Sequence, residues 1–312
     1  MPYYICVDGG GTKTAYALFN EREELLALRE GPGTNHENLE NAFDEAAARL
    51  WAGIQALLND TDKSLDEIDF TLMGLAGVDH PFQYDALMEK LRGHGLARFE
   101  IFNDGFIVVK AGSRSGAAIG LNLGTGTCCN AIDRRGRRWQ LSGLGDFSGD
   151  IGNGQWIAAQ TFKLIYDDWI LEIEPTALTA MAKKAFSLDA PDDLLALLQD
   201  IPEEGGSATI RTLIDLFFDA AAAGDTPVLR LIDRMALRGA QLIAAHLRTL
   251  DFPEQGAEVV LSGSIHTKLP SGMYIYLLKQ KAEALSGRRL EFMILGQPPV
   301  TGCIKWILQE YA

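Results

Sequence analysis

The stretch DGGGTKT at residues 8–14 lies between two apolar runs, residues 3–7 and 15–19, that both have the character of strands. Three consecutive glycines let the backbone turn sharply and bring bare N–H groups against an anion, while Thr12 and Lys13 can add a hydroxyl and a cation. Asp8 ends the first strand, where a carboxylate is well placed for a magnesium ion. The pattern therefore predicts a hairpin turn that binds phosphate.

Two common glycine-rich phosphate loops fit this stretch less well. The dinucleotide-binding fingerprint and the P-loop both lead from a strand into a helix. Here the chain continues as AYALF at residues 15–19, which has no helical period. We therefore expect a site formed by a strand, a turn and a second strand.

The same pattern returns near the middle of the chain. An apolar run at residues 117–123 leads into GTGT at residues 124–127, and a second run follows at residues 128–133. Because internal repetition is stronger evidence than either motif alone, the two hairpins predict two lobes that hold one nucleotide between them. Glycine and threonine are also ordinary turn residues, so a purely structural role stays open for each hairpin taken alone.

Composition and charge narrow the function classes. The chain has 312 residues, of which 47% are hydrophobic, enough to fill the cores of two domains. No apolar run reaches the ~18 residues that a membrane helix needs, and the start lacks the features of a signal peptide, so we expect a cytoplasmic protein without a membrane partner. A net charge of −14 disfavours a nucleic-acid partner. The four cysteines form no CxxC pair, which argues against a zinc site and a disulfide framework.

Hydrophobic periodicity predicts three strands, then helix, strand, helix and strand in the first half. The strands are residues 3–7, 15–19, 25–29, 70–75 and 99–103, and the helices are residues 38–58 and 83–91. The second half restarts with strands at 117–123, 128–133 and 139–141, and helices dominate residues 154–250. It ends with strand, helix, strand and helix at 258–261, 273–285, 290–295 and about 300–311. The glycine and serine cluster at 112–116 is the best boundary, giving domains of residues 1–114 and 115–312.

Several short motifs occur in the order found in one family: the two hairpins, GTNH at 33–36, GLAG at 74–77, Asn103-Asp104, residues 143–152 and SGS at 262–264. They resemble the N-acetylglucosamine kinase and BadF-type ATPase family, part of the actin-like and sugar-kinase ATPases. The resemblance covers nearly the whole chain. It implies an α/β fold of two ribonuclease-H-like lobes with mixed sheets, a helical insertion in the second lobe, and a C-terminal helix, about residues 300–312, that packs back on the first. It also implies ATP and Mg²⁺ as cofactors, a small-molecule sugar substrate and a homodimer.

Asp104 is the candidate general base. It follows a predicted strand and precedes a glycine, where a carboxylate can project into a cleft and take the proton from a sugar hydroxyl that attacks the γ-phosphate. An N-cap role for a helix that begins near Gly105 fits the sequence equally well. The resemblance favours the catalytic role.

The resemblance assigns two groups of residues to the ATP phosphates. Those of the first hairpin are Gly10, Gly11, Thr12 and Lys13, and those of the second hairpin are Thr125, Gly126 and Thr127. The turn at 262–264 looks like the family's adenosine-side turn, through Gly263 and Ser264. Asp8 resembles the family's magnesium-associated aspartate, which holds the ion through water. Stabilising the tight turn is a role that Asp8 can combine with metal binding.

Three residues match positions of the family that bind the sugar. Asn35 and His36 match a substrate-binding pair, and Asp150 matches an aspartate that hydrogen-bonds sugar hydroxyls. A lone histidine in a loop is more often a polar surface residue, so that interpretation of His36 stays open. Asp79 and His80 receive no role from the sequence.

The chain departs from the family pattern in the sugar-recognition region. Family kinases commonly have GWG where this chain has GLG at 143–145, and GDEGS where it has GDIGN at 149–153. The expected activity is ATP-dependent phosphorylation of an amino sugar or hexose, with N-acetylglucosamine or glucosamine as the first candidates and the 6-hydroxyl as the acceptor. The departures affect substrate identity and leave the phosphate chemistry untouched.

Three alternatives belong to other classes. An ATPase that activates a partner enzyme uses a cysteine-ligated iron–sulfur cluster in this family, and no cysteine here has a plausible cluster neighbour. A transcriptional regulator on the same fold needs a helix-turn-helix and a basic face, whereas this chain begins directly with the phosphate-binding strand. A kinase homologue that binds sugar with weak turnover is favoured by Leu144 and Ile151, which replace the family's Trp and Glu.

Overall fold

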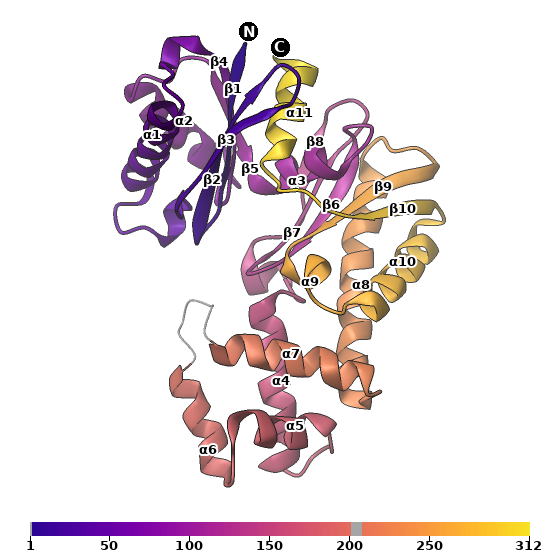
Figure 1. The fold of residues 1–312 in the computed structure, drawn as a ribbon. Coiled ribbons are helices and arrows are strands. Elements are labelled where there is room, and N and C mark those ends of the chain that lie inside the picture. The colour runs from indigo at the N-terminus through magenta and orange to yellow at the C-terminus, as the bar shows by residue number, and fades with distance from the viewer. Residues whose placement is uncertain (1, 201–207) are drawn as a thin grey trace. The chain divides into compact units, whose positions relative to one another are not determined.

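The computed structural model describes residues 2–200 and 208–312 (Figure 1). The chain forms two compact units, and neither is one continuous segment. Unit 1 comprises Met1–Gly120, Asn130–Gln140 and Leu295–Ala312, and unit 2 comprises Leu121–Cys129 and Leu141–Ile294. Helices and two five-stranded sheets make up the structure, which confirms the predicted α/β class.

The first sheet has the strand order β3-β2-β1-β4-β5. Its strands are β1 (Tyr3–Gly9), β2 (Lys13–Asn20), β3 (Leu25–Pro32), β4 (Ile68–Leu75) and β5 (Phe99–Asn103). The first three pair antiparallel, whereas β4 and β5 run parallel to β1, so the sheet is mixed. The register aligns Gly9 with Leu75 and Leu75 with Asn103. The carboxyl ends of three parallel strands therefore meet at one edge, the edge at which open α/β sheets bind ligands.

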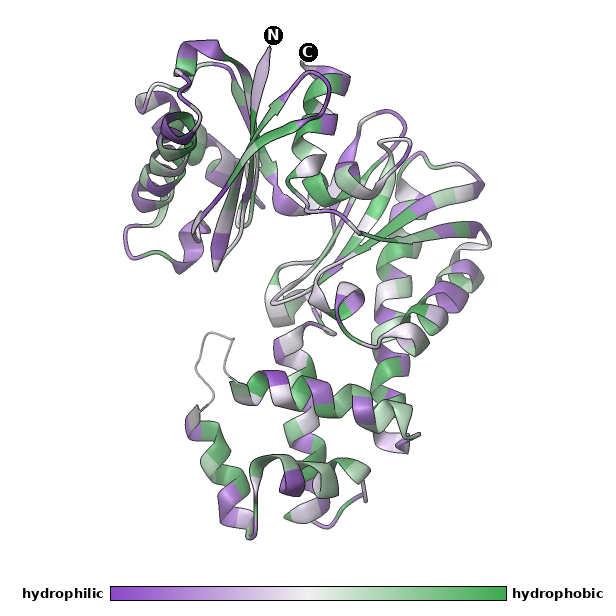
Figure 2. Ribbon diagram, viewed as in Figure 1, coloured by the Kyte–Doolittle hydropathy of each residue, from purple (hydrophilic) through white to green (hydrophobic). Residues whose placement is uncertain are grey.

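Helices cover this sheet. Helix α1 (Ala42–Asp60) buries a stripe of apolar residues against Ile5, Val7 and Leu18, and α2 (Pro81–Gly93) packs against α1. Helix α3 (Asp104–Gly112) packs against the C-terminal helix α11 (Thr301–Glu310), which also contacts β1 and β4. A Cβ atom at Gly302 would lie 1.9 Å from the carbonyl oxygen of Ile107, so α11 approaches α3 as closely as glycine permits. Figure 2 shows hydrophobic and hydrophilic stretches along α11, and the buried residues of this helix include Ile304, Trp306 and Ile307.

The second sheet has the order β10-β9-β6-β7-β8. Its strands are β6 (Ala118–Leu123), β7 (Thr127–Ile132), β8 (Arg138–Gln140), β9 (Gln255–Ser262) and β10 (Arg289–Ile294). Strand β10 runs parallel to β9, and β8 pairs antiparallel with β7. The division between the units passes through β6 and β7, because residues 121–129 belong to unit 2 and the β7–β8 turn belongs to unit 1.

The predicted helical segment between β8 and β9 is confirmed. It contains α4 (Gly154–Trp169), α5 (Ala177–Phe186), α6 (Pro191–Ala196), α7 (Ala208–Ala222) and α8 (Thr226–Thr249). Helices α9 (Ser264–Thr267) and α10 (Gly272–Ser286) follow β9, and α10 packs on the apolar face of α8. Within the described residues, no helix combines the length and apolarity that crossing a bilayer requires.

The order of elements follows the sequence prediction, with differences at the ends of elements. Strand β2 begins at Lys13 rather than at residue 15, so the glycine turn is tighter than the apolar run suggests. Helix α1 begins at Ala42 rather than at residue 38, because residues 36–38 form a separate 3₁₀ turn. Cys6, Cys129 and Cys303 are buried as expected, whereas Cys128 is partly exposed.

Candidate functional site

The turn of the first hairpin is held from outside by the segment that follows β3. The Gly10 N–H donates to the Lys13 carbonyl at 3.0 Å, and the Gly10 carbonyl accepts from the N–H groups of Thr34 and Asn35 at 3.0 and 3.3 Å. A Cβ atom at Gly33 would lie only 2.0 Å from the Gly11 carbonyl oxygen. The segment at 33–35 therefore supports the hairpin turn, which leaves Gly11 and Thr12 exposed.

Lys13 has a partner within the same sheet. Its Nζ lies 2.5 Å from Glu30 Oε1 on β3, and both side chains are largely exposed. An exposed ion pair contributes little stability. The predicted contact of Lys13 with phosphate would therefore require only that an anion outcompete Glu30.

Two carboxylates stand at the edge where the parallel strands end. Asp8 is the penultimate residue of β1, and burial raises its pKa to about 6 against the opposing effect of Lys13. Asp104 begins α3, directly after β5, and its pKa is raised to about 7. Burial is the largest cause for Asp104, followed by repulsion from the carboxylates of Asp8 and Asp79. Asp8 and Asp79 are therefore close enough to Asp104 to raise its pKa.

The alternative role of Asp104 as a helix N-cap is wrong. Asn103 is the N-cap of α3, because its side-chain oxygen accepts from the Gly105 N–H at 2.9 Å. Asn and Asp cap helices about equally well, so the sequence could not decide between the two neighbours. Asn103 therefore supplies the cap, while hydrogen bonds from the backbone of Gly105 and of Asp104 itself favour the charged form of the Asp104 carboxylate.

Asp79 is a site residue that the sequence did not assign. It follows the GLAG turn after β4, and its Oδ1 accepts from Asn103 Nδ2 at 2.9 Å and from Gln140 Nε2 at 2.7 Å. Burial is the main cause that raises the pKa of Asp79. Its place in the turn that follows a parallel strand was the available signal, whereas Asp104 follows its strand directly.

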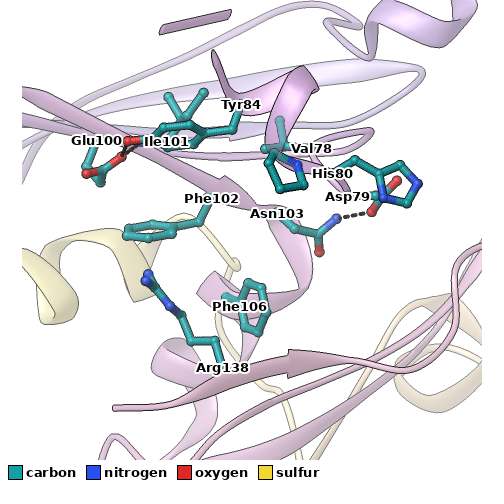
Figure 3. Close-up of a pocket in the computed structure, with 11 residues that line it drawn as sticks. Val78, Asp79, His80, Tyr84, Glu100, Ile101, Phe102, Asn103, Phe106 and Arg138 are labelled. Atoms are coloured by element: carbon teal, nitrogen blue, oxygen red, sulfur yellow. Dashed lines mark hydrogen bonds between the residues drawn. The ribbon is translucent and has the colours of Figure 1, made fainter. Parts of the chain in front are cut away.

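A pocket of about 250 Å³ lies against Asp79 and Asn103 (Figure 3). The close-up shows these two side chains at one end and Tyr84 with Glu100 at the other. Phe102 of β5 forms part of the wall, and the guanidinium group of Arg138 lies over its ring at 4.5 Å.

The predicted substrate pair, Asn35 and His36, lies beside the hairpin. Asn35 Oδ1 accepts from the Glu37 N–H at 3.1 Å and lies against Gly77, where a Cβ atom would come within 2.3 Å of it. His36 is buried and stacks on Phe43 with ring centroids 4.1 Å apart. Burial lowers the pKa of His36, which favours the neutral form of its ring. The interpretation of His36 as an exposed surface residue is therefore wrong.

In unit 2 the second glycine loop adjoins the turn after β9. Gly263 has a φ of +87°, and a Cβ atom there would lie 2.1 Å from the Leu123 carbonyl oxygen. A Cβ atom at Gly124 would in turn lie 3.8 Å from Gly263 Cα. The structure thus brings the predicted phosphate loop and the predicted adenosine-side turn together.

The exposed and buried members of these two turns differ in their contacts. Thr125, Gly126 and Ser264 are exposed. Thr127 is buried, its hydroxyl donates to the Ile151 carbonyl at 3.4 Å, and Asn153 Nδ2 lies 3.3 Å from the same oxygen. Thr127 therefore also ties the glycine loop to the start of α4.

Asp150 organises its own loop with one oxygen. Its Oδ2 accepts from the N–H groups of Gly143 and Gly145, each at 2.9 Å. Its Oδ1 is buried and has no hydrogen-bond partner among the described residues. A buried acceptor without a partner is costly unless water or a ligand supplies a donor. A sugar hydroxyl is one such donor.

The described residues contain no group of three or more His, Cys, Asp or Glu side chains that could hold a metal ion. Asp8 offers a hard oxygen donor, and a nearby positive charge would favour its charged form, which burial disfavours. Magnesium keeps several waters and commonly takes its remaining ligands from one or two carboxylates and from phosphates. The residues present therefore fit an ion shared with a phosphorylated ligand.

Comparison with known proteins finds similarity along most of the chain. The model of the BadF/BadG/BcrA/BcrD ATPase family matches residues 5–284. The N-acetyl-D-glucosamine kinase of Dictyostelium discoideum is 24% identical over 234 residues, 71% of this chain and 72% of that protein. The N-acetylmuramic acid/N-acetylglucosamine kinase of Clostridium acetobutylicum is 27% identical over 198 residues, 62% of this chain and 63% of that protein. A solved structure of a candidate N-acetylglucosamine kinase from Chromobacterium violaceum superposes with a TM-score of 0.68 at 21% identity, covering 99% of both chains.

Proposed function

We propose, from the premise that the chain belongs to the BadF/BadG/BcrA/BcrD ATPase family, that it is an ATP-dependent sugar kinase. The names of the similar proteins support a sugar as the phosphoryl acceptor and make N-acetylglucosamine the first candidate, with glucosamine or another hexose as alternatives. We further propose the 6-hydroxyl as the acceptor group. A homodimer is the proposed assembly, on the family resemblance alone.

One observation carries the proposal: Asp104 is a partly buried carboxyl with a pKa of about 7 at the edge where β1, β4 and β5 end. In the proposed reaction, the sugar hydroxyl oxygen forms a bond to the γ-phosphorus of ATP while the bond from that phosphorus to the β-bridging oxygen breaks. The hydroxyl proton passes to the Asp104 carboxylate, and the products are a sugar phosphate and ADP. A base whose pKa is close to the working pH is effective in such a transfer.

The nucleotide contacts follow from the two glycine turns. Gly10, Gly11, Thr12 and Lys13 are the proposed phosphate contacts of unit 1, and Asp8 is the proposed magnesium ligand. Thr125, Gly126 and Thr127, with Gly263 and Ser264, are the proposed ATP contacts of unit 2. When bound, magnesium would neutralise charge on the phosphates. The exposure of most of these turn residues supports the assignment.

The sugar contacts are proposed on different grounds. Asp150 keeps one buried oxygen without a protein partner, which suits a hydroxyl donor. The amide oxygen of Asn35 is engaged with its own turn, and His36 is buried. We therefore assign direct sugar contact to Asp150 and Asn35, and we expect His36 to shape the loop that presents Asn35.

A direct test incubates the protein with ATP and magnesium and with one sugar at a time: N-acetylglucosamine, glucosamine, N-acetylmuramic acid or glucose. The product is identified by mass spectrometry, and the phosphorylated position by phosphorus NMR. We expect a 6-phosphate from at least one amino sugar. The absence of a phosphorylated product from every sugar, with ATP binding retained, would favour the sugar-binding homologue with weak turnover.

A further inference from the structure

Four polar side chains close a hydrogen-bonded ring beside Asp104. Asp79 Oδ1 accepts from Asn103 Nδ2 at 2.9 Å, drawn in Figure 3, and from Gln140 Nε2 at 2.7 Å. Asn130 Nδ2 completes the ring by donating to Asn103 Oδ1 at 2.9 Å and, over a longer 3.5 Å, to Gln140 Oε1. An ionised carboxylate can only accept, so Asp79 fixes the direction in which both neighbouring amides point. The ring therefore has one consistent arrangement of donors and acceptors.

The ring is attached to the backbone on both sides of Asp104. Asn103 precedes Asp104, and its ring oxygen also accepts from the Gly105 N–H at 2.9 Å. Gly105 follows Asp104 and lies against the Asn130 side chain, because a Cβ atom at Gly105 would come within 2.5 Å of Asn130 Cγ. Asn130 is fully buried, so its amide cannot exchange this role for contact with water. Asn130 thus donates a hydrogen bond to Asn103 and packs against Gly105, the two residues that flank Asp104.

We propose that Asn130 is a positioning residue for Asp104. The side chain of Asn130 sits on β7, remote in sequence from α3, and orients Asn103 and the first turn of α3 so that the Asp104 carboxylate reaches the sugar hydroxyl. This inference rests on the proposed function of Asp104 as general base. A misplacement of a reacting group by about 1 Å can cost about a hundredfold in rate. Asn130 touches neither substrate in this account, so its loss lowers kcat more than it changes either KM.

The main variant is Asn130→Leu, which keeps the branching and the number of heavy atoms of the side chain and removes both donated hydrogen bonds. The matched control is Asn20→Leu. Asn20 is also buried in unit 1, and its side chain accepts from the N–H groups of Arg22 and Glu24. Asn20 pairs with Tyr3, at the other end of β1 from Asp8, so its loss disturbs the fold without reaching Asp104.

The measurement is steady-state ADP release with the sugar that the wild-type protein phosphorylates, alongside thermal unfolding of each variant. For Asn130→Leu we expect kcat to fall about tenfold to a hundredfold, with both KM values within about threefold of wild type. For Asn20→Leu we expect a lower melting temperature and a wild-type kcat. Asn130→Asp, which keeps the size and polarity of the side chain but cannot donate to Asn103 Oδ1 when ionised, should lower kcat in the same direction and provides a second test if Asn130→Leu does not fold.

The outcomes separate this inference from the function on which it rests. If the wild-type protein releases ADP with sugar and the folded Asn130 variants keep their kcat, the positioning role is refuted and the kinase proposal stands. An equal loss of kcat in Asn20→Leu would also refute it, because the effect would then be general destabilisation. If no sugar stimulates ADP release by the wild-type protein, both proposals fail together.

Discussion

Asp104 combines partial burial with two neighbouring carboxylates, and the consequence is a pKa of about 7. Burial disfavours the charged form, and the charges of Asp8 and Asp79 act in the same direction. Hydrogen bonds from the backbone of Gly105 and of Asp104 itself act in the opposite direction, and Asn103 supplies the helix cap. Carboxyl groups with strongly shifted pKa values are concentrated at functional sites, so the raised pKa supports a chemical role for Asp104.

The first prediction concerns the pH dependence of the reaction. A general base acts in its deprotonated form, so kcat/KM for the sugar should rise with pH, roughly tenfold per pH unit, and level off above about pH 7. The measurement is initial-rate ADP release at low sugar concentration from about pH 5 to about pH 9. A profile that stays level through this range would show that no carboxyl with a raised pKa limits the reaction.

At the residue scale the sequence singled out Asp104 as a candidate but could not describe its surroundings. Its position after a strand and before a glycine was readable from the local pattern. The residue that caps the N-terminus of α3 could not be predicted from the sequence. Asn103 is held in place by hydrogen bonds to Asp79 and Asn130, which are distant in sequence. The burial of His36 likewise depends on Phe43, whose ring stacks on it from α1.

The glycine turn between β1 and β2 is held in shape by contacts from residues outside the hairpin. Its glycine turn carries few side chains of its own, so the segment at 33–35 holds it by two backbone hydrogen bonds to Gly10 and by the close approach of Gly33 to Gly11. Arg49 of α1 adds a bond to the Gly33 carbonyl at 2.8 Å. The shape of the turn is therefore set by neighbouring segments as well as by its glycines.

The second prediction tests this support with Gly33→Ala. A methyl group would lie 2.0 Å from the Gly11 carbonyl oxygen, and since backbone cannot yield as a flexible side chain can, the turn must shift. We expect KM for ATP to rise about tenfold or more, with a smaller change in KM for the sugar. Gly93→Ala is the matched control, because a Cβ atom there meets nothing within 4 Å. A wild-type KM for ATP in Gly33→Ala would contradict the supporting role.

At the element scale the sequence was informative where local pattern decides the structure. Apolar runs on either side of glycine predicted β1, β2, β6 and β7, because strand and turn propensities agree there. The alignment of Gly9, Leu75 and Asn103 at one edge was less accessible, since register depends on pairing between strands far apart in the chain.

At the scale of the whole molecule, unit 1 depends on the last residues of the chain. Trp306 of α11 is 1% exposed and stacks on Phe102 of β5 with ring centroids 4.0 Å apart. The ammonium group of Lys110, on α3, lies over the Trp306 ring at 5.1 Å from its centroid and forms an ion pair with Glu310 at 3.0 Å. Local pattern predicted a terminal helix, but only the family resemblance indicated the lobe on which it packs.

The third prediction is that Trp306→Ala strongly destabilises unit 1. Removing a buried tryptophan typically costs about 3–5 kcal/mol, through lost burial and the cavity that remains. Urea unfolding followed by circular dichroism measures the change. Phe82→Ala is the control, because Phe82 is 62% exposed and its loss should cost less than about 1 kcal/mol. Equal stability of the two variants would mean that α11 contributes little to unit 1.

The measurement that tests the central claim most directly compares the wild-type protein with Asp104→Asn in sugar-dependent ADP release. Asparagine keeps the size of the side chain but cannot accept the hydroxyl proton, so kcat should fall by about 10²–10⁴-fold while ATP binding is retained. Sugar-dependent ADP release at the wild-type rate in Asp104→Asn would contradict the account, because the proton would then have another acceptor.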